Sequence, residues 1–151
     1  MKDRTGRALK GGVDYNVSYP KGMKNVGKYT VKVTFKENYS GSKSLTYTIN
    51  PKGTGVSKVT AAKKGFKVTW KKQKTQTTGY QVQYSTDKNF KKNNKTVTIS
   101  KNNTTSKSVG KLKAKKKYYV RVRTYKIVKF GGKSVKLYSG WSKAKSVTTK
   151  K

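Results

Sequence analysis

The sequence predicts an all-β protein in which a seven-stranded antiparallel β-sandwich follows a smaller N-terminal β module. Apolar and polar residues alternate in short runs along most of the chain, and no run has the period of a helix. In the clearest run, Tyr118, Val120, Val122 and Thr124 fall on one face of an extended strand, and the residues between them fall on the other. One face can therefore join a core while the other meets water.

Three alternating runs make up the first 50 residues. They cover residues 15–19, 29–35 and 45–49. The second run is the richest in β-branched and aromatic side chains, which favour strands. Turn residues separate the runs, at Pro20-Lys21-Gly22 and at Asn38-Tyr39-Ser40-Gly41, and the third run stops before Pro51. We therefore expect residues 1–50 to be a β module.

Residues 51–55, Pro-Lys-Gly-Thr-Gly, interrupt the alternation and predict a short linker. Residues 56–150 then predict seven short strands at the spacing typical of a sandwich. Their runs lie at residues 56 onward, 65–70, 79–86, 97–99, 109–112, 118–125 and 138–147. Phe130-Gly131-Gly132-Lys133 predicts a hairpin turn before the last of them.

Several of these residues form a recognisable pattern. It consists of Trp70 at the end of the second strand, Gly79–Thr86 for the third, Leu112 with Tyr118 six residues later, Val120-Arg121-Val122, and Gly140-Trp141-Ser142 before the last strand. In this pattern, residues 54–150 resemble a fibronectin type III domain. The resemblance implies that Leu112 and Tyr118 form the tyrosine corner of that family, in which the tyrosine hydroxyl bonds to upstream backbone.

The same resemblance gives the large aromatic residues a structural role. We expect Trp70 and Tyr118 to pack in the core, and Trp141 to lie near an edge beside Gly140. The sequence departs from the family where Ala114-Lys115-Lys116-Lys117 replaces the usual proline and glycine before the tyrosine. The integrin-binding Arg-Gly-Asp tripeptide of the family is absent, so that function is not expected.

The N-terminal module carries a second resemblance. Gly12–Tyr19, Asn25–Val33, Asn38-Tyr39-Ser40-Gly41 and Tyr47-Thr48-Ile49 are similar to a short immunoglobulin-like repeat of bacterial surface proteins. Such repeats usually carry another strand upstream of the first residue here, so the resemblance implies a truncated repeat. Three strands would leave an open edge, and we expect weak homo-oligomers to form through it.

The charge of the chain limits its partners. Lys+Arg total 39 against 4 for Asp+Glu, which gives a formal net charge of +35. A chain this basic attracts anionic cell-wall polymers, acidic glycans and nucleic acid. Only four of the cations are arginines, which recognise phosphates and bases bidentately, so nucleic acid is expected to bind only non-specifically. The simpler explanation, which we favour, is a solvated lysine coat.

The composition offers little for chemistry. The chain has no cysteine and no histidine, and its carboxylates are Asp3, Asp14, Glu37 and Asp87, none of them in a paired motif. No nucleophile elbow, phosphate-binding glycine loop or metal-ligand cluster is present. We therefore expect no catalytic residue, no cofactor, no metal and no membrane span.

One set of residues stands out as a candidate binding face. Tyr119, Arg121, Arg123 and Tyr125 alternate along one strand, where two arginines and two tyrosines could stack on sugars or bases and hold phosphates or sulfates. The alternative is ordinary cross-strand pairing on a solvated sheet. If the face meets water, Arg121→Ala should cost little stability.

The two resemblances together imply a non-catalytic structural, adhesion or spacer module of a larger bacterial cell-surface or cell-wall-associated protein, located outside the cell. The alternative is a polyanion-binding module that uses its lysine-rich surface to hold an acidic glycan, teichoic acid or nucleic acid. A third hypothesis, recognition of neutral sugars by the aromatic face, predicts binding that survives high salt.

Overall fold

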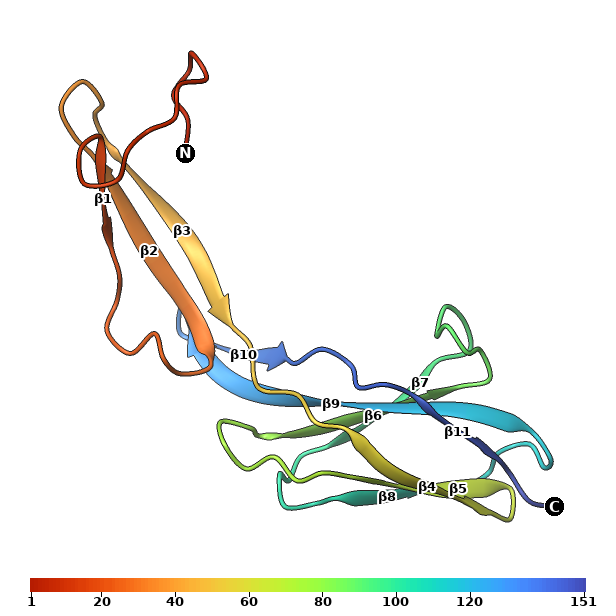
Figure 1. Cartoon of the computed structure of the whole chain (residues 1–151). Helices are drawn as coiled ribbons and strands as arrows, with labels where there is room; N and C mark the ends of the chain where they lie inside the picture. The colour runs from red at the N-terminus through yellow and green to blue at the C-terminus, as the bar shows by residue number, and fades with distance from the viewer. The chain divides into compact units, whose positions relative to one another are not determined.

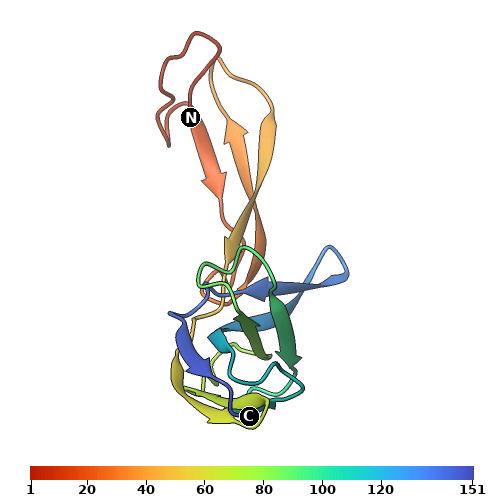
Figure 2. The same ribbon diagram turned by 90° about the vertical axis from the view of Figure 1, so that its right-hand side faces the viewer.

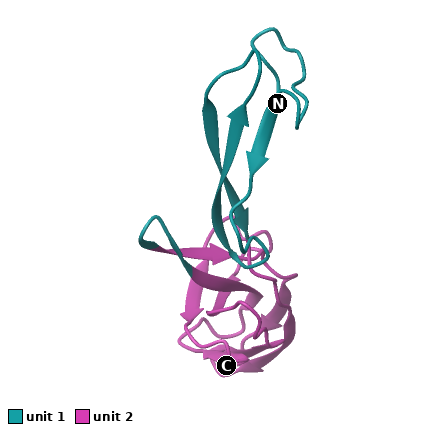
Figure 3. Ribbon diagram, turned by 90° about the vertical axis from the view of Figure 1, so that its left-hand side faces the viewer, with its two compact units in different colours: residues 1–49, 128–133 teal, residues 50–127, 134–151 magenta.

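The computed structural model describes residues 1–151 and contains eleven strands and no helix. The predicted all-β, antiparallel class is confirmed. The chain divides into two compact units (Figures 1 and 3). Unit 1 comprises residues 1–49 with residues 128–133, and unit 2 comprises residues 50–127 with residues 134–151.

Unit 1 contains a three-stranded sheet in the order β1-β2-β3, in which β1 is Tyr15–Ser18, β2 is Gly27–Phe35 and β3 is Ser42–Ile49 (Figure 2). Both pairings are antiparallel, with Val17 opposite Val33 and Val31 opposite Leu45. Val31 and Val33 are the buried hydrophobic residues of this unit, whereas Leu45 and Tyr47 are exposed. β3 is thus an edge strand with little cover on its apolar face.

Unit 2 contains two sheets. The first has the order β4-β5-β8, with β4 at Val56–Ala62, β5 at Gly65–Trp70 and β8 at Ser106–Val109. The second has the order β10-β9-β6-β7, and β11 also pairs with β9. Its strands are β6 at Gly79–Ser85, β7 at Lys95–Ile99, β9 at Lys117–Phe130, β10 at Lys133–Tyr138 and β11 at Lys145–Thr148.

The core of unit 2 lies between these two sheets. Its largest members alternate along their strands, as the sequence predicts. The buried cluster consists of Phe66, Val68, Trp70, Tyr80, Val82, Val109, Tyr118, Val120, Val122 and Val147. Because β5 and β8 contribute from one sheet and β6, β9 and β11 from the other, the unit is a sandwich.

The last strand of the sandwich is interrupted, so unit 2 has eight strands where the sequence predicts seven. β10 and β11 both pair with β9, and residues 139–144 between them leave the ladder. The hairpin that connects β9 to β10 turns at Gly131 and Gly132, which have φ values of 57° and 75°. Two consecutive positive φ angles match a type I′ turn, which favours glycine.

Residues 51–55, predicted as a linker, belong to unit 2 and are hydrogen-bonded to other residues of that unit. The Thr124 hydroxyl donates to the Lys52 carbonyl at 2.7 Å. The Lys71 N–H donates to the Gly55 carbonyl at 3.1 Å. Pro51 is buried. The segment therefore continues the sandwich as an ordered entry to β4.

Candidate functional site

The four residues of the predicted binding face lie on β9, on the side opposite Val120 and Val122. Tyr119, Arg121 and Arg123 are half-buried. Tyr125 is only 2% exposed, so the expectation that this face meets water along its whole length is wrong. Tyr125 lies opposite Gly79 on β6, and the missing side chain there leaves room for its ring. The Tyr138 ring lies beside it, with 6.2 Å between ring centroids.

Arg121 and Arg123 are stacked between aromatic rings. The Arg121 guanidinium carbon lies 4.0 Å from the centroid of Phe90 and 4.8 Å from that of Trp141. The Arg123 guanidinium carbon lies 4.3 Å from the Trp141 centroid and 3.9 Å from the Tyr138 centroid. We call this set, Phe90, Arg121, Trp141, Arg123 and Tyr138, the arginine–aromatic stack. Cations this close to ring faces are attracted by the ring quadrupole.

The edges of the two guanidinium groups are bonded to glutamines on β6. Arg121 donates from Nε and Nη2 to Gln83 Oε1 at 2.9 and 2.6 Å. Arg123 donates in the same way to Gln81 Oε1 at 3.0 and 2.8 Å. Each glutamine amide then donates to a threonine hydroxyl on β7, Gln81 to Thr98 and Gln83 to Thr96. Two parallel polar rows therefore cross β9, β6 and β7.

Burial lowers the pKa of both arginines, and for Arg121 the neighbouring charge of Arg123 lowers the pKa further. Burial also raises the pKa of Tyr125, with a further contribution from Tyr138. These directions agree with a partly dry face. The geometry uses both guanidinium groups to hold the protein's own aromatic and amide groups, which leaves them little freedom to stack on a sugar or a base.

Sequence reasoning placed Gln81 and Gln83 outward on the neighbouring strand, but it did not find Phe90 and Tyr138 on this face. Trp141 was expected near an edge, but its position over the arginines was not foreseen. These side chains are distant in sequence from β9, and only the strand register brings them together. The remaining residue of the predicted face, Tyr119, faces the ammonium group of Lys117, whose Nζ lies 5.6 Å from the ring centroid. It takes no part in the stack.

The residues expected to be structural lie in or beside the core. Trp70 is 3% exposed, with its ring 5.4 Å from that of Tyr80, and its Nε1 has no hydrogen-bond partner. Leu112 packs against the core cluster. The Lys113 N–H donates to the Tyr118 hydroxyl over 3.4 Å. A hydroxyl contact with upstream backbone, as the resemblance implies, is thus present at Tyr118.

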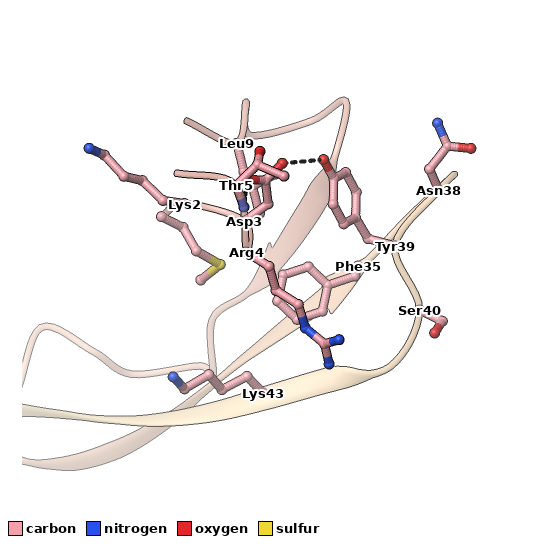
Figure 4. Close-up of a pocket in the computed structure, with 11 residues that line it drawn as sticks. Lys2, Asp3, Arg4, Thr5, Leu9, Phe35, Asn38, Tyr39, Ser40 and Lys43 are labelled. Carbon is pink, nitrogen blue, oxygen red and sulfur yellow. Dashed lines mark hydrogen bonds between the residues drawn. The ribbon is translucent and has the colours of Figure 1, made fainter. Parts of the chain in front are cut away.

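Unit 1 has a pocket that sequence reasoning did not predict (Figure 4). Its volume is about 680 Å³, and its lining includes Asp3, Arg4, Phe35, Tyr39 and Lys43. The Tyr39 hydroxyl donates to Asp3 Oδ2 at 3.1 Å, and the Thr5 hydroxyl donates to Asp3 Oδ1 at 2.7 Å. The hydrogen bond from Thr5 lowers the pKa of Asp3 more than any other contact. Asp3 is thus occupied in holding residues 1–9 together.

The structure offers no grouping of three or more carboxylate, histidine or cysteine side chains able to hold a metal ion. Nor does it contain a helix with the length and apolar character needed to cross a membrane.

Comparison with known proteins identifies the sandwich. The model of the fibronectin type III domain family matches residues 49–139. Among solved structures, the chain is similar to the FN1-FN3 domains of chicken CNTN1, with a TM-score of 0.55 and 21% identity over 87% of this chain and 46% of that one. It is also similar to a beta-1,2-glucanase from Parabacteroides distasonis, with a TM-score of 0.50 and 14% identity over 82% of this chain and 18% of that one.

At these identities the two structures show a shared fold alone. The chain spans less than half the length of either one. A search of curated proteins found no match.

Proposed function

This chain belongs to the fibronectin type III family, and from that premise we propose that it is a non-catalytic structural, adhesion or spacer module of a larger protein on a bacterial cell surface or cell wall. Domains of this family are typically structural or spacer modules and typically non-catalytic. The proposal adds the bacterial, extracellular setting, which the resemblance of residues 1–50 to an immunoglobulin-like surface repeat supports.

The observation that carries the proposal is the arginine–aromatic stack. Its two guanidinium groups contact three aromatic rings and two amides of the same unit, those of Phe90, Trp141, Tyr138, Gln81 and Gln83. Such a cluster rigidifies a sheet, which suits a module that transmits position or force. The same internal use of the aromatic rings argues against recognition of neutral sugars by this face.

The spacer proposal is tested in the parent protein. Replacement of residues 50–151 by an unrelated fibronectin type III domain of equal length should preserve the parent's activity and surface exposure, whereas deletion of these residues should impair both. Antibodies against unit 2 should label intact cells. Labelling only after lysis, or loss of activity on the domain swap, would contradict the proposal.

A second candidate function is polyanion binding, and the charge balance is the observation that favours it. The chain carries a formal net charge of +35 and has a single salt bridge, between Arg7 and Asp14 at 3.8 Å. Almost all of its cations are therefore not neutralised by a carboxylate of the chain, and their charge can attract an external polyanion.

Salt titration tests this second function. If lysine–phosphate contacts hold a polyanion, log Kd should change linearly with log salt concentration, because binding releases condensed counterions. DNA duplexes of different sequence should bind with similar affinity. Tight, sequence-selective binding at physiological salt would contradict a lysine coat.

A further inference from the structure

One concave part of the basic surface stands out at an end of the sandwich in unit 2. A pocket of about 670 Å³ opens where β6 ends, where β7 begins and along the loop between β8 and β9. Four lysines line it, Lys95, Lys111, Lys113 and Lys116, and all four are exposed. No carboxylate belongs to the lining. The pocket therefore gathers positive charge that the protein itself does not neutralise.

The loop that carries three of these lysines is held in place by backbone hydrogen bonds. The Leu112 N–H donates to the Lys64 carbonyl at 2.8 Å, and the Lys115 N–H donates to the Thr149 carbonyl at 3.0 Å. The Lys116 N–H donates to the hydroxyl of Thr149 at 3.1 Å, and Thr149 is buried. Lys111 has a φ of 58°. The backbone that bears the lysines is thus fixed before any ligand arrives, which lowers the entropy lost on binding.

The pocket also contains two tyrosines, whose rings lie 6.2 Å apart. The Tyr118 hydroxyl already accepts the Lys113 N–H, but the Tyr84 hydroxyl makes no hydrogen bond in the structure. The Tyr84 hydroxyl is not fully buried, because Trp70 Nε1 is the only fully buried polar side-chain atom that lacks a hydrogen-bond partner. Burial, with the nearby Tyr118, raises the pKa of Tyr84, so its hydroxyl stays protonated and able to donate.

The lining selects among anions. Lysine binds phosphate as a point charge with rotatable donors, whereas the planar, bidentate arginine is the side chain that recognises carboxylates and nucleobase edges by their shape. No arginine lines this pocket. Thr86 and Asn93 add neutral polar groups that can bond hydroxyls. We propose that this pocket binds phosphate groups of a polyol-phosphate polymer, with the Tyr84 hydroxyl as an additional donor.

This inference goes beyond the spacer role, and neither depends on the other. It also differs from binding by total charge, because it assigns the contact to one place. The probe is a synthetic poly(glycerol phosphate) oligomer, titrated into the full chain at about 150 mM salt, where binding by dispersed charge is weak. Isothermal titration calorimetry measures Kd, and the tyrosine signals in NMR spectra locate the contact.

Two variants with the same net charge distinguish binding in the pocket from binding by the lysines spread over the rest of the surface. The pocket variant combines Lys111→Gln, Lys113→Gln and Lys116→Gln. The control combines Lys58→Gln, Lys67→Gln and Lys107→Gln, which are exposed on the β4-β5-β8 sheet and outside the pocket. We expect the pocket variant to weaken binding about tenfold or more, and the control by about twofold, because local contacts dominate at this salt. Equal losses in the two variants would overturn the proposal, as would the absence of wild-type binding.

A third variant tests the tyrosine without any change of charge. Tyr84→Phe should weaken binding by about tenfold or more through the loss of one hydrogen bond to a charged group. Thermal unfolding followed by tryptophan fluorescence checks that each variant is folded. An unchanged Kd for Tyr84→Phe would remove the hydroxyl from the proposal. A single-stranded oligonucleotide that binds as tightly as the polyol phosphate, with the same loss in the pocket variant, would overturn the choice of polymer.

Discussion

Arg123 shows why a lysine-rich protein keeps a few arginines. Its planar guanidinium lies over the rings of both Trp141 and Tyr138 while its edge donates twice to Gln81. A lysine ammonium could neither stack between two rings nor donate in a fork. The two arginines of unit 2 therefore occupy positions where charge alone is not enough.

Arg123→Lys should thus lower the free energy of unfolding of unit 2 by about 1–3 kcal/mol, although the charge is kept. The exposed Lys67→Arg on β5 serves as control and should change it little. Denaturation in urea measures both. If Arg123→Lys is as stable as the wild type, the contacts of the Arg123 guanidinium do not contribute to the free energy of unfolding. The low cost that the sequence alone predicts for Arg121→Ala is revised upward for the same reason.

The hydrogen bonds of Asp87 predict that the stability of unit 2 depends on pH. Its carboxylate accepts the N–H groups of Asn89, Lys91 and Lys92 at 2.9–3.2 Å. These bonds, that from Asn89 first, hold the pKa of Asp87 below its usual value. The folded-state pKa is lowered, so the stabilisation is present above the unfolded pKa and is lost as pH falls through the folded pKa.

We therefore expect the urea midpoint of unit 2 to fall between about pH 5 and pH 2, and expect Asp87→Asn to flatten this dependence. Both tryptophans of the chain, Trp70 and Trp141, lie in unit 2, so their fluorescence follows that unit. Asp87 is the only aspartate or glutamate within residues 50–151. An identical pH profile in the variant would exclude Asp87 as the source.

Side chains that alternate along one strand could be assigned from the sequence, and so could the outward glutamines of the neighbouring strand, but the aromatic partners could not. Val120 and Val122 are buried where the period of two places them. Tyr125 is buried although the period places it outward, because Gly79 and Tyr138 lie beside it. Such burial depends on which residue of the neighbouring strand lies opposite, and the strand register that decides this cannot be deduced from the residues near Tyr125 in sequence.

Between β10 and β11, serine hydroxyls take over the hydrogen bonds that a continuous strand would make to β9. The Thr124 N–H donates to Ser139 Oγ, and the Val122 N–H donates to Ser142 Oγ, each at 3.0 Å. The backbone N–H groups of the same serines donate back to the carbonyls of Thr124 and Val122. The ladder of β9 is thus completed while the chain between the serines is free to place Trp141 over the arginines.

Ser142→Ala should lower the free energy of unfolding of unit 2 by about 1–3 kcal/mol, because it leaves the Val122 N–H without an acceptor. Ser142→Thr, which keeps a hydroxyl, should recover most of the loss. Ser146→Ala, on the exposed side of β11, is the matched control. Amide exchange at Val122 gives a second readout, and unchanged protection there in the alanine variant would show that the hydroxyl is dispensable.

At the scale of elements, the strands and the Gly131-Gly132 turn followed from alternation and turn chemistry. The split of the last strand did not, because Ser139 and Ser142 look like ordinary polar residues until their place beside β9 is known. The basic pocket was equally hidden: lysines are spread along the chain, and only the course of the β8–β9 loop gathers four of them.

At the scale of the whole molecule, the two units differ in how much they bury. Unit 1 has Val31 and Val33 as buried hydrophobic residues, whereas the sandwich of unit 2 has a cluster that spans both sheets. Small cores give marginal stability. We therefore expect the amides of β1, β2 and β3 to exchange faster than those of β5, β6 and β9. Equal protection in both units would contradict this.

The edge of β3 gives the last prediction. The Phe35 N–H donates to the Gly41 carbonyl, which fixes the alternation of bonded pairs between β2 and β3. By this alternation, Leu45 and Tyr47 bond to β2, and the backbone groups of Thr46 and Thr48 point to the open edge. Open edges pair with other chains, although the lysines of this protein repel one another at low salt.

We expect the chain to be monomeric at low salt and to form dimers as salt screens its charge, which sedimentation velocity can measure. Thr46→Pro should abolish the dimer and leave the sheet folded, because the N–H it removes points outward. Leu45→Pro should instead disrupt unit 1, because it removes a bond to Val31. If Thr46→Pro unfolded the unit while Leu45→Pro did not, the alternation would be inverted. A monomer at every salt concentration would contradict pairing through this edge, because screened lysines no longer hold the chains apart.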